Sequence, residues 1–98
     1  MEAPNDPGTL ILASLTADTR HGHAIMQDIE SFAGVRLGPG TLYGALQRLE
    51  RDGLIKAVPA ADRRQPYRLT EAGSKALSAR LEAFAAVIRT AEHRLDTR

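Results

Sequence analysis

The sequence predicts a mainly α-helical fold with one small β-hairpin and a long C-terminal helix. Three observations support this prediction. Apolar residues recur at helical spacing in several segments, the pattern becomes extended between residues 54 and 69, and an apolar heptad runs through the last quarter. The chain has 98 residues, enough for one domain with a small core, so we also expect it to self-associate.

The composition argues against several classes of protein. The chain has no cysteine, so neither a disulfide framework nor a thiolate metal site is available. Apolar runs such as residues 83–88 are too short to span a bilayer. Residues 1–6 lack the basic and apolar regions of a signal peptide. We therefore expect a cytoplasmic protein without a membrane role.

Positive charge is concentrated in the middle of the chain. Residues 36–68 contain seven cations and three acids, a local charge of +4, whereas the whole chain has a net charge of only +1. The rest of the chain is therefore acidic. A basic segment in an otherwise acidic chain is typical of a nucleic-acid-binding surface.

Two helices are predicted at the start of the chain. Asp6 and the proline after it predict a helix start, because Asp caps the first turn and Pro fits the first helical position. This helix should end near Ala17, and the polar residues 18–22 should form a connection. Residues 25–33 then repeat apolar side chains at helical spacing, and Gly34 is the expected stop.

A third helix is predicted between Pro39 and Gly53, because Pro suits the first turn and Gly can end a helix in the left-handed conformation. One face is apolar and should be buried; it carries Leu42, Ala45, Leu46 and Leu49. The opposite face carries Tyr43, Gly44, Gln47 and Arg51. Glycine, a hydroxyl, an amide and a cation on one face suit the major groove of DNA.

Segments 54–58 and 67–69 are predicted to be the strands of a hairpin, with residues 59–66 as its loop. The prolines of this loop suit the open edges of the hairpin rather than a central strand. Arg63 and Arg64 lie near the tip. An ordinary surface hairpin is the alternative, but two adjacent cations favour contact with phosphate or the minor groove.

Thr70 is the predicted N-cap of a last helix that runs almost to Arg98. A helix of about 28 residues spans roughly 42 Å, more than so small a domain covers. Its apolar residues are spaced alternately four and three apart, and we assign this heptad seam to dimerisation. The seam comprises Leu77, Leu81, Phe84, Ile88, Ala91 and Leu95. The alternative is a helix that packs only on its own domain.

These elements predict a winged helix-turn-helix domain over residues 1–73 and a dimerisation helix over residues 74–98, forming one compact unit. In a dimer the two third helices should lie roughly 34 Å apart, one turn of DNA. We assign Tyr43, Gly44 and Gln47 to base edges and Thr41 to a phosphate. The cations assigned to the DNA backbone are Arg48, Arg51, Arg63 and Arg64. The alternatives are packing on the second helix for Tyr43 and a solvated helix end for Arg51.

Enzymatic chemistry has little support in the sequence. His21 and His23 are one residue apart and lack the i, i+4 spacing that places two metal ligands on one helix face. No serine lies in a nucleophile elbow, and no glycine-rich loop carries the Lys-Ser/Thr pair that binds phosphates. We predict no enzyme, metal or cofactor. A dimeric protein-interaction module with a winged-helix fold is the alternative to DNA binding.

Four short motifs, taken together, resemble one family. They are His21-Gly22, Pro39-Gly40-Thr41-Leu42-Tyr43, Leu46-x-x-Leu49-Glu50-x-x-Gly53-Leu54-Ile55 and Tyr67-Arg68-Leu69-Thr70-Glu71-Ala72-Gly73. From about residue 10 onward the chain resembles PadR-family transcriptional regulators, in particular the smaller subfamily with a single C-terminal helix. The resemblance implies a homodimer that binds a pseudo-palindromic operator in double-stranded DNA, usually as a repressor.

The chain departs from the family pattern at several points. His23 stands where relatives commonly have Tyr, and Gly38 stands where many have Ser before Pro-Gly-Thr. The chain has no Trp, so it cannot hold flat drugs between interface tryptophans as some relatives do. A small-molecule effector of unidentified chemistry is a further partner to consider. Residues that line its cavity or, as we favour, form interface core are Leu12, Leu15, Phe84 and Ile88.

Overall fold

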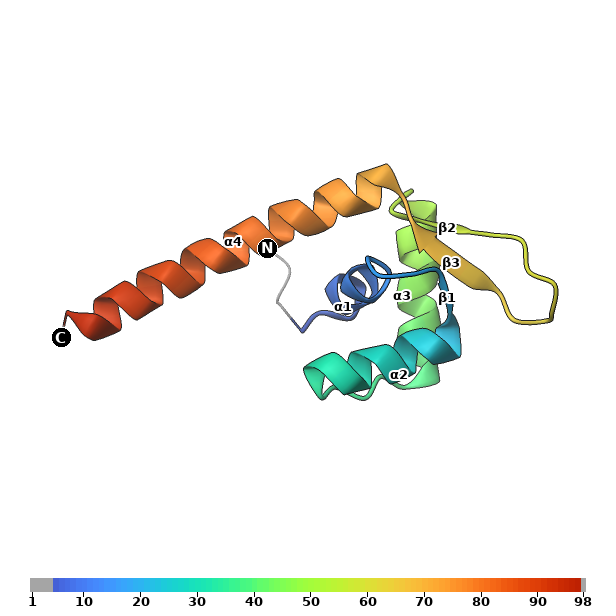
Figure 1. Cartoon of the computed structure of the whole chain (residues 1–98), viewed down its shortest axis with the longest axis horizontal. Coiled ribbons are helices and arrows are strands. Elements are labelled where there is room, and N and C mark those ends of the chain that lie inside the picture. The colour runs from blue at the N-terminus through green and yellow to red at the C-terminus, as the bar shows by residue number, and fades with distance from the viewer. Residues whose placement is uncertain (1–4, 98) are drawn as a thin grey trace.

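The computed structural model describes residues 5–97 and contains four helices and a small three-stranded antiparallel sheet (Figure 1). The helices are α1 (Pro7–Ser14), α2 (Gly22–Ala33), α3 (Pro39–Arg51) and α4 (Glu71–Asp96). The strands are β1 (Arg20–His21), β2 (Ile55–Ala57) and β3 (Pro66–Leu69). The predicted fold class is confirmed. The ends of the predicted domain bounds, residues 1–4 and 98, lie outside the described residues.

Local capping residues define most of the helix ends as predicted. The Asp6 carboxylate accepts a hydrogen bond from the Thr9 amide at 3.2 Å, and the Thr70 hydroxyl accepts one from the Gly73 amide at 3.0 Å. Gly34 ends α2 with a φ of 68°. Helix α1, however, ends at Ser14, before the predicted Ala17, because the chain tightens there into a turn in which the Thr16 amide binds the Ala13 carbonyl.

The sheet differs from the predicted hairpin in one respect. Residues 20–21 form a third strand, β1, so the segment 18–22 is not merely a connection. Strand β3 lies between β1 and β2, and His21 is paired with Pro66. The expectation that the prolines avoid a central strand is therefore wrong for Pro66. It is accommodated at the first position of β3, where its carbonyl accepts a hydrogen bond from the Val58 amide at 3.1 Å.

The hydrophobic core lies between α1, α2 and α3, and the first part of α4 closes it. Its fully buried aliphatic side chains include Ile11, Leu12, Ile25, Ile29, Leu42 and Leu46. Burial of each such side chain contributes about 1.5–3 kcal/mol. Leu12 and Leu15 are buried inside the protomer itself, so the expectation that they form interface core is wrong, and they do not line a cavity that faces a second copy.

Polar groups connect the helices around this core. The buried Ser14 hydroxyl donates a hydrogen bond to the Asp28 carboxylate at 2.7 Å, and Arg20 donates one to the Ser14 carbonyl at 3.3 Å. Arg80 of α4 donates a hydrogen bond to the buried Thr9 hydroxyl at 3.0 Å. Within residues 5–97, every buried polar side-chain atom has a partner, so none carries the energetic cost of an unmet hydrogen bond.

Hydrogen bonds and close backbone packing join the end of α3 to the start of α4. Gly53 adopts a φ of 76°, and the Leu54 amide binds the Leu49 carbonyl at 2.9 Å, which completes a Schellman cap on α3. The Thr70 hydroxyl donates a hydrogen bond to the Gly53 carbonyl at 2.7 Å, and the Thr70 amide donates one to the Leu54 carbonyl at 3.1 Å. A Cβ atom on Gly73 would overlap that Leu54 carbonyl. The two helices thus meet through backbone contacts that leave no room for a side chain.

This junction predicts that Gly73→Ala destabilises the fold, even though alanine normally favours a helix. The added methyl group meets a backbone carbonyl rather than a flexible side chain, so we expect a loss of about 1–3 kcal/mol in the free energy of unfolding. Urea unfolding followed by circular dichroism measures this loss. Gly40→Ala is the matched control, because no heavy atom lies within 4 Å of its Cβ position. If Gly73→Ala unfolds at the wild-type urea concentration, the packing described for this junction is incorrect.

Candidate nucleic-acid interface

Helix α3 presents the predicted polar face to solvent. Leu42, Ala45, Leu46 and Leu49 are buried against the rest of the domain. On the opposite side Gln47 and Arg51 are exposed, and Gly44 is partly exposed. Thr41, in the first turn of the helix, is also exposed. No side chain caps the N-terminus of α3, because Gly38 occupies the N-cap position. The first turn therefore leaves backbone donors open to solvent.

Tyr43 lies at the border of this face and takes part in packing. Its ring covers Gly22 at the start of α2 so closely that a Cβ atom there would lie 2.7 Å from the Tyr43 hydroxyl oxygen. The side chain is nevertheless 50% exposed. Burial raises the pKa of the neighbouring Tyr67, with smaller contributions from the charges of Glu50 and Tyr43. Tyr43 therefore packs on the second helix and still offers an exposed edge.

Strands β2 and β3 and the connecting residues 58–65 form a hairpin, which we call the wing. At its tip Asp62 accepts hydrogen bonds from the Arg64 amide at 2.9 Å and from Nη2 of the Arg64 guanidinium at 2.9 Å. These hydrogen bonds from Arg64 lower the pKa of the Asp62 carboxyl. Arg63, next to this ion pair, is exposed. The tip of the wing thus carries two exposed cations, of which Arg64 is oriented by Asp62.

The cations of α3 have different surroundings. Arg51 is exposed and pairs with Asp52 at 3.3 Å, so its charge is partly offset at the helix end. Arg48 lines a hollow together with Asp6 and Arg80, and its Nη1 atom would lie 3.5 Å from a Cβ atom on Gly44. Arg48 therefore flanks the outward face of α3 rather than occupying its centre.

A hollow of about 260 Å³ lies between the start of α2, the N-terminal half of α3 and the wing. It is lined by His21, Gly22, His23, Tyr43, Arg63, Arg64, Gln65 and Tyr67. The structure thus brings Tyr43 together with Arg63 and Arg64, although they are about 20 positions apart in the sequence. Sequence reasoning did not place His21 or Tyr67 here, because both reach the hollow through the pairing of β1 with β3.

The residues of the α4 heptad seam fall into a buried group and an exposed group. Leu77 and Phe84 are only 5% and 8% exposed, because they face their own protomer. Leu81, Ile88 and Leu95 are more than half exposed, as is Val87. Figure 1 shows the second half of α4 extending away from the other helices. An exposed apolar surface of this kind on a small protein typically marks an interaction site.

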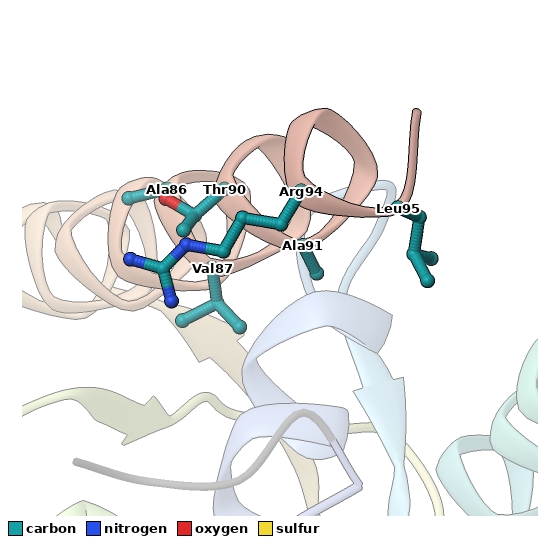
Figure 2. Close-up of a pocket in the computed structure, with 6 residues that line it drawn as sticks. All are labelled: Ala86, Val87, Thr90, Ala91, Arg94 and Leu95. Carbon is teal, nitrogen blue, oxygen red and sulfur yellow. The ribbon is translucent and has the colours of Figure 1, made fainter. Parts of the chain in front are cut away.

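A shallow apolar depression lies on the distal turns of α4 (Figure 2). It is lined by Ala86, Val87, Thr90, Ala91, Arg94 and Leu95. The Arg94 side chain extends back along the helix, so its guanidinium lies near Val87 in this view. Residues 5–97 contain neither a group of three or more acidic, His or Cys side chains suited to a metal nor a helix long and apolar enough to cross a membrane.

Comparison with known proteins identifies the family. Residues 11–79 match the family described as "Transcriptional regulator PadR-like family". An uncharacterized 37.1 kDa protein in transposon TN4556 of Streptomyces fradiae is 45% identical over 73 residues, which are 74% of this chain and 21% of that protein. Transcriptional regulator Rv3488 of Mycobacterium tuberculosis is 44% identical over 61 residues, 59% of this chain. The chain spans 21% and 56% of the lengths of these two relatives.

Solved structures share the fold of this chain. The crystal structure of a PadR family transcription regulator from Clostridium difficile R20291 superposes with a TM-score of 0.81 and 24% identity, covering 91% of this chain and 97% of that one. At this identity the likeness concerns the fold alone. The family match extends over more than two thirds of the chain, from α1 through the wing to the first part of α4. The chain therefore belongs to the PadR-like family, whose members are transcriptional regulators and not enzymes.

Proposed function

We propose that the protein is a sequence-specific DNA-binding regulator that binds a pseudo-palindromic operator as a homodimer and represses transcription. The observation that supports this proposal most directly is the placement of the α3 outward face beside the wing. Gln47 on α3 and Arg63 on the wing are both exposed, and Tyr43 lies between α2 and the hollow next to the wing. A helix flanked by a basic hairpin can occupy a major groove while the hairpin contacts the adjacent backbone or minor groove.

The proposed reading residues are Tyr43, Gly44 and Gln47. Gln47 has an exposed amide that can pair with a base edge, and Gly44 allows the helix to approach the groove closely. Thr41, Arg48, Arg51, Arg63 and Arg64 are proposed to contact phosphates. Among these, Arg48 lies on the flank of α3, so we expect it to contribute least.

The exposed part of the heptad seam supports the homodimer. Ile88 is 54% exposed and Leu81 is 52% exposed, whereas similar residues in the core are fully buried. A second copy that covers them would also join the two small cores and set the spacing of the two α3 helices. Ala91 and Leu95, further along α4, are exposed and available to the same interface.

The central experiment is selection of bound sequences from random duplex DNA. We expect an enriched half-site repeated with two-fold symmetry, with the half-sites about one DNA turn apart. Absence of any enriched sequence, together with absence of salt-sensitive binding, would instead favour a protein-interaction module. Selection also supplies the duplexes for the following measurements.

Tyr43→Ala and Gln47→Ala should each weaken binding to the selected duplex by about 1–3 kcal/mol while the protein stays folded. The reason is that each substitution removes a side chain assigned to base edges. Fluorescence anisotropy measures the affinity, and a scrambled duplex reports the change in specificity. Ser78→Ala on the exposed side of α4 is the control. Unchanged affinity in both variants would mean that α3 reads DNA with a different face.

The double substitution Arg63→Ala and Arg64→Ala should lower affinity for every sequence. Removing two phosphate contacts should also reduce the slope of log affinity against log salt by up to about two units. Anisotropy titrations at several salt concentrations measure the slope. Lys75→Ala with Arg89→Ala removes two exposed cations from α4 and serves as the matched control. An unchanged slope would show that the tip of the wing stays away from DNA.

Ile88→Glu should convert the dimer to a monomer, because it would bury a charge in the proposed apolar interface. Sedimentation equilibrium measures the mass, and we expect the variant to have about half the wild-type value. Arg89→Glu, one position further along the same exposed helix, should leave the mass unchanged. A wild-type protein that is already monomeric at micromolar concentration contradicts the assignment of the seam to self-association.

A further inference from the structure

We propose that His21, the last residue of β1 and the N-cap of α2, and Arg64 of the wing together bind one phosphate of the DNA backbone. This inference rests on the proposed function and assigns His21 a role in it. The two side chains come from segments more than 40 positions apart, and Nε2 of His21 lies 3.3 Å from Nη1 of Arg64. Both line the hollow between α2, α3 and the wing.

The tautomer of a neutral His21 follows from its position as the N-cap of α2. Its Nδ1 atom accepts a hydrogen bond from the Ala24 amide at 3.3 Å, which makes the imidazole the side-chain cap of the helix. A neutral imidazole carries one proton, so a nitrogen that accepts leaves the proton on the other nitrogen. In the capping form, therefore, Nε2 carries the hydrogen and faces Arg64 as a donor.

Arg64 is oriented toward the same point by Asp62. The carboxylate accepts hydrogen bonds from Nε at 3.2 Å and from Nη2 at 2.9 Å, and the Arg64 amide binds the same residue. Nη1 is the nitrogen that lies beside His21. A guanidinium has only donors. The structure thus places two N–H groups next to each other, and neither can accept a hydrogen bond from the other.

An anionic oxygen between the two N–H groups would satisfy both of them, because its lone pairs can accept two hydrogen bonds at once. The charge of Asp62 is already offset by its ion pair with Arg64 at 2.9 Å, and Arg63 adds a further cation to the lining. Tyr43 of α3 borders the same hollow. A ligand oxygen held here would therefore lie on the side of the molecule that presents α3. A backbone phosphate of the bound duplex has the required charge and location.

The opposite tautomer gives a different outcome. If Nδ1 carried the proton, Nε2 would accept from Arg64, α2 would lose its side-chain cap, and no anion would be needed. His21→Asn separates the two roles, because Asn is a good N-cap but its side chain is too short to replace Nε2. Arg64→Ala, on the exposed wing, removes the other half of the clamp without touching α2.

The test is a methylphosphonate scan of the selected duplex, in which each phosphate in turn is made neutral. For the wild type we expect several sensitive positions in each half-site, and at one of them, the phosphate bound by His21 and Arg64, neutralisation should lower affinity about tenfold. In His21→Asn and in Arg64→Ala this position should lose most of its effect. The preference for the selected over a scrambled duplex should persist, because phosphate contacts carry no direct sequence information. His93→Asn, which changes an exposed histidine of α4, should reproduce the wild-type scan.

The outcomes distinguish this clamp from the proposed function. If the wild type prefers the selected duplex but the scan of His21→Asn coincides with that of the wild type, the clamp is wrong and DNA recognition stands. A wild-type protein that binds no duplex overturns both. Urea unfolding establishes that each variant is folded. If His21→Asn is unstable, His21→Ser, which also supplies a good N-cap but no Nε2, replaces it in the scan.

Discussion

The arrangement of this protein depends on one backbone junction. The carbonyl of Leu54, just past the end of α3, accepts a hydrogen bond from the Thr70 amide at 3.1 Å and has the Cα of Gly73 packed against it. The hairpin leaves and returns at this point, and α4 starts from it. Because the contacts are between backbone groups, they fix the direction of α4 relative to α3 more tightly than flexible side chains would. The wing is held beside α3 by the same junction.

This constraint has a consequence for the rest of the fold. Only the first half of α4 packs on its own domain, through Leu77 and Phe84, while Leu81, Ile88 and Leu95 remain exposed. Helix α4 is one continuous helix of 26 residues, and its direction from the junction carries its second half away from the other helices (Figure 1). The apolar surface of that half therefore remains available to another molecule. In the proposed dimer the same rigidity would transmit the position of α4 to α3, and so determine the spacing of the two reading helices.

The elements predicted correctly are those with local signals. Capping residues such as Asp6, Gly34 and Thr70 act within one turn of the helix they end, so they are visible in the sequence. The strand Arg20–His21 has no such signal, because two residues show no periodicity and its pairing with Tyr67 and Pro66 is long-range. The heptad spacing likewise identified an apolar stripe but not which members of it face the core. Which residues of the stripe are buried depends on the position along α4 at which the helix extends past the rest of the domain.

The same reasoning explains why the role of His21 could not be predicted from the sequence. His21 opens α2, which suggests a cap or a metal ligand, and nothing nearby in the chain indicates Arg64. The pairing of β1 with β3 brings the start of α2 to the wing, and Asp62 orients the guanidinium. The proton on Nε2 then follows from capping, because Nδ1 is already used as an acceptor. The hydrogen bond that caps α2 thus also leaves Nε2 of His21 as a donor for the proposed phosphate clamp. Helix capping and anion binding therefore depend on the same tautomer.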